Sequence, residues 1–245
     1  MRTQIIQVPY DSGRKNYRMG RGPSWIVGHL QSENFLVDEL QMHDLREAEI
    51  YTSFEVARQL AKKACDVVHS GRFPLVLAGG CMSSLGTLAG LGEQPAIIWL
   101  DAHADFNTPD ITISGFLDGM ALATSVGKCW GRMAATIPDF RPVPDRQVAL
   151  VGARQFNVDE RSLFSSSGVY LIEAQRIRHG DLRAELDPFL AKIQKYAKRA
   201  YLHIDFDVLD PIEARVNEFS APGGLRLTDL IRAGCCRDHC LRSCV

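Results

Sequence analysis

Short apolar runs alternate along the chain with longer segments in which apolar residues recur at helical spacing. The short runs predict strands, several of them buried on both faces, at residues 4–8, 75–78, 96–100, 147–151, 169–172 and 200–206. The longer segments predict helices at residues 22–30, 52–70, 120–126 and 187–199. Because the predicted strands and helices alternate along the chain, we expect an α/β fold with a mainly parallel central sheet.

Residue types at the ends of the periodic segments predict where the helices begin. Thr52 and Glu55 match a capping box at the start of one helix. Asp187 and Pro188 predict the start of the last helix, because proline is tolerated in a first helical turn. Residues 106–119 follow no clear period and predict a loop.

Two of the predicted strands end in groups of acidic residues. The strand at 96–100 is followed by Asp101, His103 and Asp105, which project to one side if the backbone stays extended. The strand at 200–206 ends in Asp205 and Asp207, which are also two positions apart. Open α/β sheets place ligands at the carboxyl ends of strands, so both groups stand where a site is expected.

A divalent cation explains these acids better than folding does. Four buried carboxylates without counter-charge would cost several kcal/mol in repulsion and lost hydration. Oxygen ligands with one imidazole suit manganese or magnesium, and zinc remains an alternative. The other interpretation is that the acids are solvated loop residues or helix caps.

Composition is compatible with a globular enzyme and excludes some other classes. The 245 residues suffice for one large domain, with 46% apolar and 23% charged residues. The net charge of −1 gives no reason to expect nucleic acid or an anionic membrane as a partner. Apolar runs stay below the roughly 18 residues that span a bilayer, and the first residues do not resemble a signal peptide. Seven cysteines, an odd number, predict reduced thiols in the cytoplasm.

Several motifs together resemble the arginase/agmatinase (ureohydrolase) family. They are Asp-Ala-His-Ala-Asp-Phe-Asn-Thr-Pro at 101–109, Ser-Gly at 114–115, Asp-Phe-Asp-Val-Leu-Asp-Pro at 205–211, Val-Pro-Tyr-Asp at 8–11, Gly-Pro at 22–23 and Gly-Gly at 79–80. The resemblance covers most of the chain. It implies a three-layer α/β/α sandwich and two manganese ions that activate a water for attack on a guanidinium-type carbon. It also implies a small guanidino or amidino substrate, and we expect a homo-oligomer.

The resemblance assigns metal ligands but also shows a departure. By the family pattern one ion is held by Asp101, His103, Asp205 and Asp207. Asp105 holds a second ion with bridging help from Asp101 and Asp205. The family's other histidine ligand is replaced by Met82, whose thioether is a poor partner for a hard cation. We therefore expect one tightly bound Mn²⁺, with the second ion weak or absent.

Four further residues occupy family positions near the substrate. Asn107 and Ser114 match the arginase positions that hold the substrate's α-carboxylate, whereas Asn157 replaces an aspartate that meets the α-amino group. Asp118 stands where arginases carry a proton-shuttling histidine, so it can accept a proton or pair with a guanidinium. The alternative interpretations are a plain turn at Asn107, a loop hydroxyl at Ser114 and a turn residue at Asp118.

The end of the chain differs from the family pattern. Four cysteines at 235, 236, 240 and 244 follow Gly223-Gly224, where the family continues with a helix, a strand and a substrate-contacting glutamate. We expect a single arginase-like domain at 1–245 that lacks the family's usual C-terminal part. The leading function is metal-dependent hydrolysis of a C–N bond in a linear amidine or guanidino compound. A catalytically inactive, binding or oligomer-forming member is the alternative, and an aspartate-based phosphotransferase leaves Asp101, His103 and Asp105 unexplained.

Overall fold

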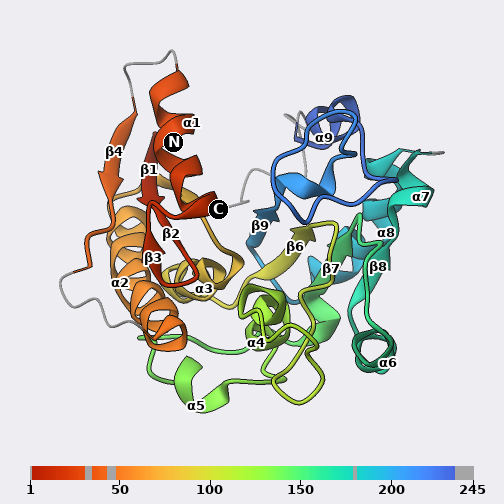
Figure 1. Cartoon of the computed structure of the whole chain (residues 1–245), viewed down its shortest axis with the longest axis horizontal. Helices are drawn as coiled ribbons and strands as arrows, with labels where there is room; N and C mark the ends of the chain where they lie inside the picture. Colours follow the sequence, from red (N-terminus) through yellow and green to blue (C-terminus); the bar gives the residue numbers. More distant parts are fainter. Residues whose placement is uncertain (1, 31–34, 43–47, 179–180, 235–245) are drawn as a thin grey trace. The chain divides into compact units, whose positions relative to one another are not determined.

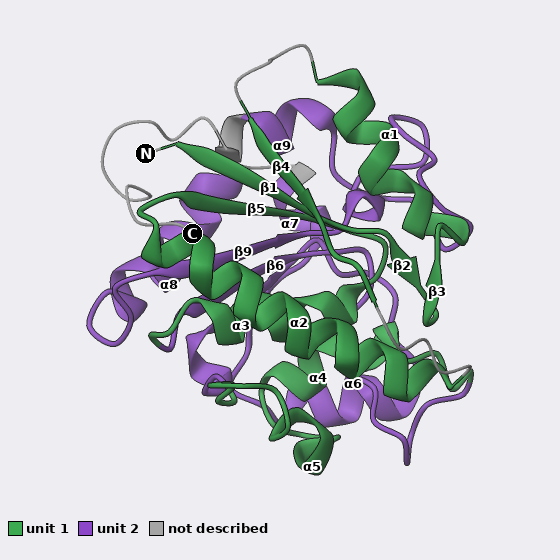
Figure 2. Cartoon of the chain, turned by 90° about the vertical axis from the view of Figure 1, so that its left-hand side faces the viewer, with its two compact units in different colours: residues 1–93, 114–142, 245 green, residues 94–113, 143–244 purple. Residues whose placement is uncertain are grey.

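The computed structural model describes residues 2–30, 35–42, 48–178 and 181–234 (Figure 1). These residues form two compact units, drawn in different colours in Figure 2. Unit 1 comprises residues 1–93 and 114–142, and unit 2 comprises residues 94–113 and 143–244. The cysteine-rich segment at 235–244 lies outside the described residues.

Unit 1 contains a three-stranded parallel sheet in the order β4-β1-β5 and a two-stranded antiparallel ribbon. Its strands are β1 (Thr3–Val8), β2 (Tyr10–Asp11), β3 (Arg14–Lys15), β4 (Leu36–Glu39) and β5 (Phe73–Ala78). Its helices are α1 (Gly22–His29), α2 (Glu49–His69), α3 (Ser84–Gly90), α4 (Ala121–Ser125) and α5 (Gly131–Ala134). Short 3-10 turns lie at η1 (Arg18–Arg21), η2 (Cys81–Ser83) and η3 (Asp118–Met120).

The core of unit 1 forms where α2 packs on the sheet. The predicted helical spacing is confirmed, because Leu60, Ala64 and Val67 of α2 are buried together with Ile6 and Val8 of β1. The predicted capping box is wrong. Helix α2 begins one turn earlier, so that the N–H of its buried residue 52 donates to the carbonyl of residue 48 inside the helix.

Unit 2 contains a four-stranded parallel sheet in the order β8-β7-β6-β9. Its strands are β6 (Ala96–Leu100), β7 (Val148–Val151), β8 (Tyr170–Ile172) and β9 (Ala200–Ile204). Its helices are α6 (Val158–Ser165), α7 (Ala174–Arg178), α8 (Leu182–Ile193) and α9 (Leu227–Gly234), with 3-10 turns η4 (Asp145–Gln147) and η5 (Phe206–Val208). Each residue of β6 is buried, as the continuous apolar run predicts.

The register of this sheet positions the acidic groups. Strand β6 lies between β7 and β9, and Leu100 pairs with Val151 on one side and Ile204 on the other. Asp101 directly follows β6 and Asp205 directly follows β9, so both come after a pair of residues that lie side by side in the sheet. Parallel pairing thus brings together two motifs that are about a hundred positions apart in the sequence.

The predicted start of helix α8 is wrong. Asp181 is the N-cap, and its side chain accepts a hydrogen bond from the N–H of Arg183 (3.0 Å). Leu182, Leu186, Phe189 and Ile193 then share the buried face, while Pro188 lies inside the helix. Two of these four buried residues, Leu182 and Leu186, come before Pro188. Their burial outweighs the cost of a proline inside the helix.

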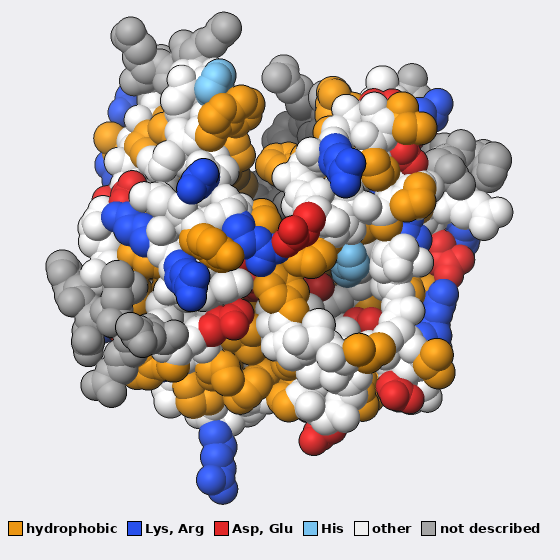
Figure 3. Space-filling view, in the orientation of Figure 1, with side chains coloured by type: hydrophobic (Ala, Val, Ile, Leu, Met, Phe, Trp, Pro, Cys, Tyr) orange, Lys and Arg blue, Asp and Glu red, His pale blue; other side chains and the backbone are white. Residues whose placement is uncertain are grey.

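Two surface properties bear on possible partners. Acidic and basic side chains are interspersed on the face drawn in Figure 3. Within the described residues, every helix is too short or too polar to cross a bilayer.

Candidate metal centre

Asp101, His103 and Asp207 meet at the carboxyl ends of β6 and β9 in unit 2. Each offers a ligand atom, and these atoms lie within 4.8 Å of one another. The Nδ1 atom of His103 is 3.3 Å from Oδ1 of Asp101 and 3.3 Å from Oδ2 of Asp207. Both aspartates are almost completely buried, whereas His103 is partly exposed. The arrangement is a buried carboxylate pair joined by one imidazole.

Asp205 lies at the same end of the sheet, whereas the backbone of Asp105 is not in the expected extended conformation. The N–H of Asp205 donates to the carbonyl of Leu100 (2.8 Å), and its Oδ1 accepts the N–H of Asp207 (2.8 Å). Asp105 is buried with a left-handed φ of 49°. The expected extension past Leu100 therefore ends before residue 105, and aspartate is among the residue types that tolerate this conformation.

The electrostatics of this group are those of a site for a cation. Burial raises the pKa of Asp101 and raises the pKa of Asp205 well above its usual range, and neighbouring carboxylates add to both. Burial alone lowers the pKa of His103, but hydrogen bonds and charge from Asp101 and Asp207 raise it to about 11. Burial opposes ionisation of Asp207, yet His103 and Asn217 lower its pKa to about 2. The His103 imidazolium thus supplies the charge that a bound cation would supply.

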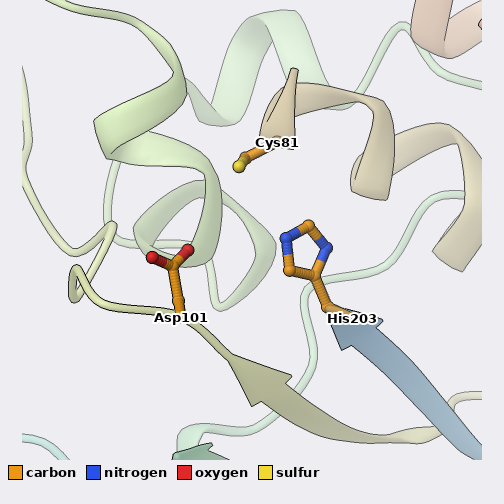
Figure 4. A group of neighbouring side chains, drawn as sticks. All are labelled: Cys81, Asp101 and His203. Carbon is orange, nitrogen blue, oxygen red and sulfur yellow. The ribbon is translucent and has the colours of Figure 1, made fainter. Parts of the chain in front are cut away.

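A tryptophan and a second histidine complete the surroundings of Asp101. The Nε1–H of Trp99 donates to Oδ2 of Asp101 (3.1 Å). The Trp99 ring stacks on His203, with 3.6 Å between centroids and 9° between planes. His203 points toward Asp101 from β9 (Figure 4). Burial lowers the pKa of His203 to about 3, so its imidazole is neutral at physiological pH.

Arg154 holds the chain segments around Asp207. Its guanidinium donates to six backbone carbonyl oxygens, those of residues 152, 207, 208, 209, 221 and 222, at 2.7–3.3 Å. Gly152 fits beside this segment because a Cβ there would lie 2.5 Å from Val208, and its φ is +88°. The side chain of Asn217 donates to Oδ2 of Asp207 (3.0 Å). Arg154 thus fixes the backbone around Asp207, and Asn217 fixes its carboxylate.

Asn107 and Asn157, both predicted to contact substrate, are paired with each other. The Nδ2 of Asn157 donates to Oδ1 of Asn107 (2.6 Å). Asn157 is also the N-cap of α6, where it forms a reciprocal capping box with Glu160. Glu160 accepts the N–H of Phe106 (3.0 Å) as well, which ties the loop after β6 to α6. The orientation of the Asn107 amide is therefore set by neighbouring side chains.

Ser114 and Asp118, the other two predicted residues, lie in unit 1. Ser114 is exposed, and its Oγ accepts the N–H of Phe116 (3.2 Å). Asp118 is buried, and its Oδ1 accepts the N–H of Met82 (2.8 Å) at the start of η2. Burial raises the pKa of Asp118 to about 7, and the charges of Asp11 and Glu49 act in the same direction.

We expect Asp118 to make the stability of the protein depend on pH. An aspartate with a folded-state pKa near 7 binds protons more strongly in the folded than in the unfolded state. Its contribution to stability is therefore complete at low pH and falls as pH rises toward 7, by up to about 4 kcal/mol. Asp118→Asn should flatten this dependence in denaturant unfolding between pH 5 and 8. Asp139→Asn, at an exposed aspartate of the same unit, should leave it unchanged. Equal pH profiles for the parent and Asp118→Asn would contradict this account.

Comparison with known proteins assigns the chain to a family. A sequence model described as the Arginase family matches residues 1–236. The chain belongs to the arginase family. It is 31% identical to the arginase of Brevibacillus brevis over 229 residues, which are 86% of this chain and 76% of that protein. It is 29% identical to the arginase of Bacillus caldovelox over 232 residues, which are 86% of this chain and 77% of that protein.

Solved structures confirm the arginase-like α/β/α fold. The arginase of Bacillus cereus superposes with a TM-score of 0.84 at 25% identity, covering 100% of this chain and 89% of that one. Formimidoylglutamase from Bacillus subtilis has a TM-score of 0.78 at 18% identity, covering 100% of this chain and 78% of that one, and shows the fold alone. The predicted membership of the ureohydrolase group is thus confirmed.

Met82 is the residue that the family resemblance predicts in place of a histidine ligand. The Met82 side chain is buried, with 3% of its surface exposed, and its backbone N–H is engaged by Asp118. The sequence pattern does not predict four residues of this site: Trp99, Arg154, Asn217 and His203. Trp99 and His203 lie within predicted strands, and the position of His203 two residues before Asp205 is the signal that places it on the same face.

Proposed function

We propose that this chain is a metal-dependent hydrolase that cleaves a C–N bond in a linear guanidino or amidino compound. The observation that carries the proposal is the buried group of Asp101, His103 and Asp207, with ligand atoms within 4.8 Å, in a chain of the arginase family. Its substrate would be a small molecule, not a nucleic acid or a membrane. We also propose a homo-oligomer in the cytoplasm.

The residues present fit a divalent cation, for which manganese is our proposal. Asp101, His103, Asp205 and Asp207 would hold one ion tightly, and Asp105 would help to hold a weaker second one. Asp101, Asp105 and Asp207 are buried, and burial raises the pKa of Asp205, so a cation would remove an electrostatic cost. When bound, such an ion lowers the pKa of a water and stabilises charge on the reacting group.

The protein's own groups orient this donor set and handle protons. Trp99 holds one oxygen of Asp101, while the N–H of Ala102 and the amide of Asn217 hold Asp207. We propose Asp118 as the group that takes up and returns a proton. A pKa near 7 suits that role at neutral pH, because both protonation states are then accessible.

We propose that the substrate carries a carboxylate, as arginine does, because Asn107 and Ser114 match the arginase positions for that group. The Asn107 oxygen accepts from Asn157, and the Asn107 side chain also hydrogen-bonds Glu160, so the amide is held in one orientation. An amide nitrogen carries two hydrogens, so it can donate to a substrate carboxylate without adding charge. Asn157, in place of an aspartate, attracts an α-amino group less strongly.

The test of this proposal compares arginine with its decarboxylated analogue agmatine on the Mn²⁺-loaded protein. Calorimetry should show tighter binding of arginine, and urea release should be slow because Met82 supplies no imidazole. Asn107→Asp should weaken arginine binding roughly tenfold or more by charge repulsion while sparing agmatine. Tighter binding of agmatine by the parent would contradict the proposed substrate. Binding of arginine without any urea release would favour the inactive, ligand-binding member of the family, which the buried Met82 supports.

A further inference from the structure

His203 carries a buried ring nitrogen that the fold does not use. Its Nε2 atom is buried and has no hydrogen-bond partner among the described residues. The Nδ1 atom lies 3.1 Å from the hydroxyl of Tyr201, so one side of the ring is engaged. Stacking on Trp99 fixes the plane of the ring. A buried, rigidly held imidazole nitrogen without a partner costs free energy unless something binds it.

The unused nitrogen of His203 faces the carboxylate of Asp101. A ring nitrogen of His203 and a carboxylate oxygen of Asp101 lie within 4.8 Å, and Figure 4 shows the nitrogen remote from the strand pointing toward Asp101. The two oxygens of Asp101 have different neighbours. Oδ1 faces His103, whereas Oδ2 accepts from Trp99, the residue stacked on His203. Asp101 therefore borders two neighbouring places where an ion could bind, one beside His103 and one beside His203.

We propose that His203 Nε2 and Asp101 bind a second divalent cation, with His203 supplying the nitrogen ligand that Met82 does not. The inference rests on the proposed metal centre, which it extends by one residue. A histidine that binds a metal normally donates its other ring N–H to a protein acceptor, which orients the ring. Donation from Nδ1 to the Tyr201 hydroxyl meets this requirement and leaves the lone pair on Nε2. Two neighbouring metal positions that share one carboxylate, each with one imidazole nitrogen, suit a pair of divalent ions.

Titration of the metal-free protein with Mn²⁺ tests the proposal. The parent should show two classes of bound ion, one tight and one weaker, when free Mn²⁺ is measured by electron paramagnetic resonance. His203→Phe keeps an aromatic ring on Trp99 but has no ligand atom, so it should abolish the weaker class and leave the tight one. The matched control is His29→Phe, because the His29 ring also lies against a tryptophan, Trp25, at 4.1 Å between centroids, and belongs to unit 1. The control should bind Mn²⁺ like the parent.

A second measurement keeps the test decisive if His203→Phe does not fold. Pulsed electron paramagnetic resonance of the fully loaded parent should show coupling to a second imidazole nitrogen that is absent when only the tight class is filled. Tyr201→Phe should weaken the second class by roughly tenfold, because it removes the acceptor that orients the ring.

The outcomes separate this inference from the proposed function. A single binding class in the parent, two unchanged classes in His203→Phe, or no second nitrogen coupling would overturn the role of His203 while leaving the metal centre intact. The absence of any Mn²⁺ binding would overturn the metal centre itself.

Discussion

Asp207→Asn should abolish tight binding of Mn²⁺ and with it the thermal stabilisation that the ion provides. Asp207 contacts His103, the N–H of Ala102 and Asn217. Burial opposes its ionisation, but these contacts lower its pKa to about 2, so that it stays ionised in the folded protein. An ion that binds only the folded state at a hundred times its dissociation constant adds about 2.7 kcal/mol of stability. For a chain of this size that corresponds to about 5 to 10 °C in Tm, all of which the variant should lose.

The measurement is metal content by mass spectrometry together with Tm in the presence and absence of Mn²⁺. Asparagine has nearly the shape of aspartate, so the variant removes charge and leaves the packing of the site in place. Asp187→Asn is the control, because Asp187 is exposed on α8 of the same unit. Equal metal content and an equal Tm shift in Asp207→Asn and the parent would contradict the assignment of Asp207 as a ligand.

Arg154→Met should reduce the free energy of unfolding by roughly 3 kcal/mol or more. The guanidinium of Arg154 donates to the carbonyls of six residues in three chain segments, and methionine fills similar space without any donor. Several of these carbonyls belong to residues that are themselves buried, such as Val208 and Leu209, so their oxygens would lose partners that water cannot easily replace. Denaturant unfolding at neutral pH measures the change directly.

Arg161→Met provides the comparison for Arg154. Arg161 is also on unit 2, but it pairs with a similarly exposed Glu173 and lies over the ring of Phe156. Exposed pairs of this kind contribute up to about 1 kcal/mol. If the two variants unfold at the same denaturant concentration, the carbonyl network of Arg154 does not hold the Asp207 segment as the structure indicates.

Local pattern predicted much of the α/β framework. The run from 96 to 100 predicted β6 because a strand buried on both faces needs apolar residues at successive positions, and the structure confirms its bounds. The spacing of apolar residues within α2 predicted its buried face, because a helix that packs on one side has apolar residues every three or four positions. The helix starts were less predictable, since Asp181 and the packing of Leu182 decide the start of α8 and Asp187 does not.

The sequence by itself determined which acids and which imidazole end the strands, and its motifs determined the family. Only the tertiary structure decided which of these side chains meet. Periodicity records the face on which a residue lies but not the neighbour across the sheet, so the pairing of β6 with β9 is needed to bring Asp101 to Asp207. The same pairing turns His203, an ordinary strand residue in the sequence, into an imidazole with a buried Nε2 atom, stacked on Trp99 beside a carboxylate. Such contacts depend on strand order, which the packing of the whole sheet fixes and no single segment encodes.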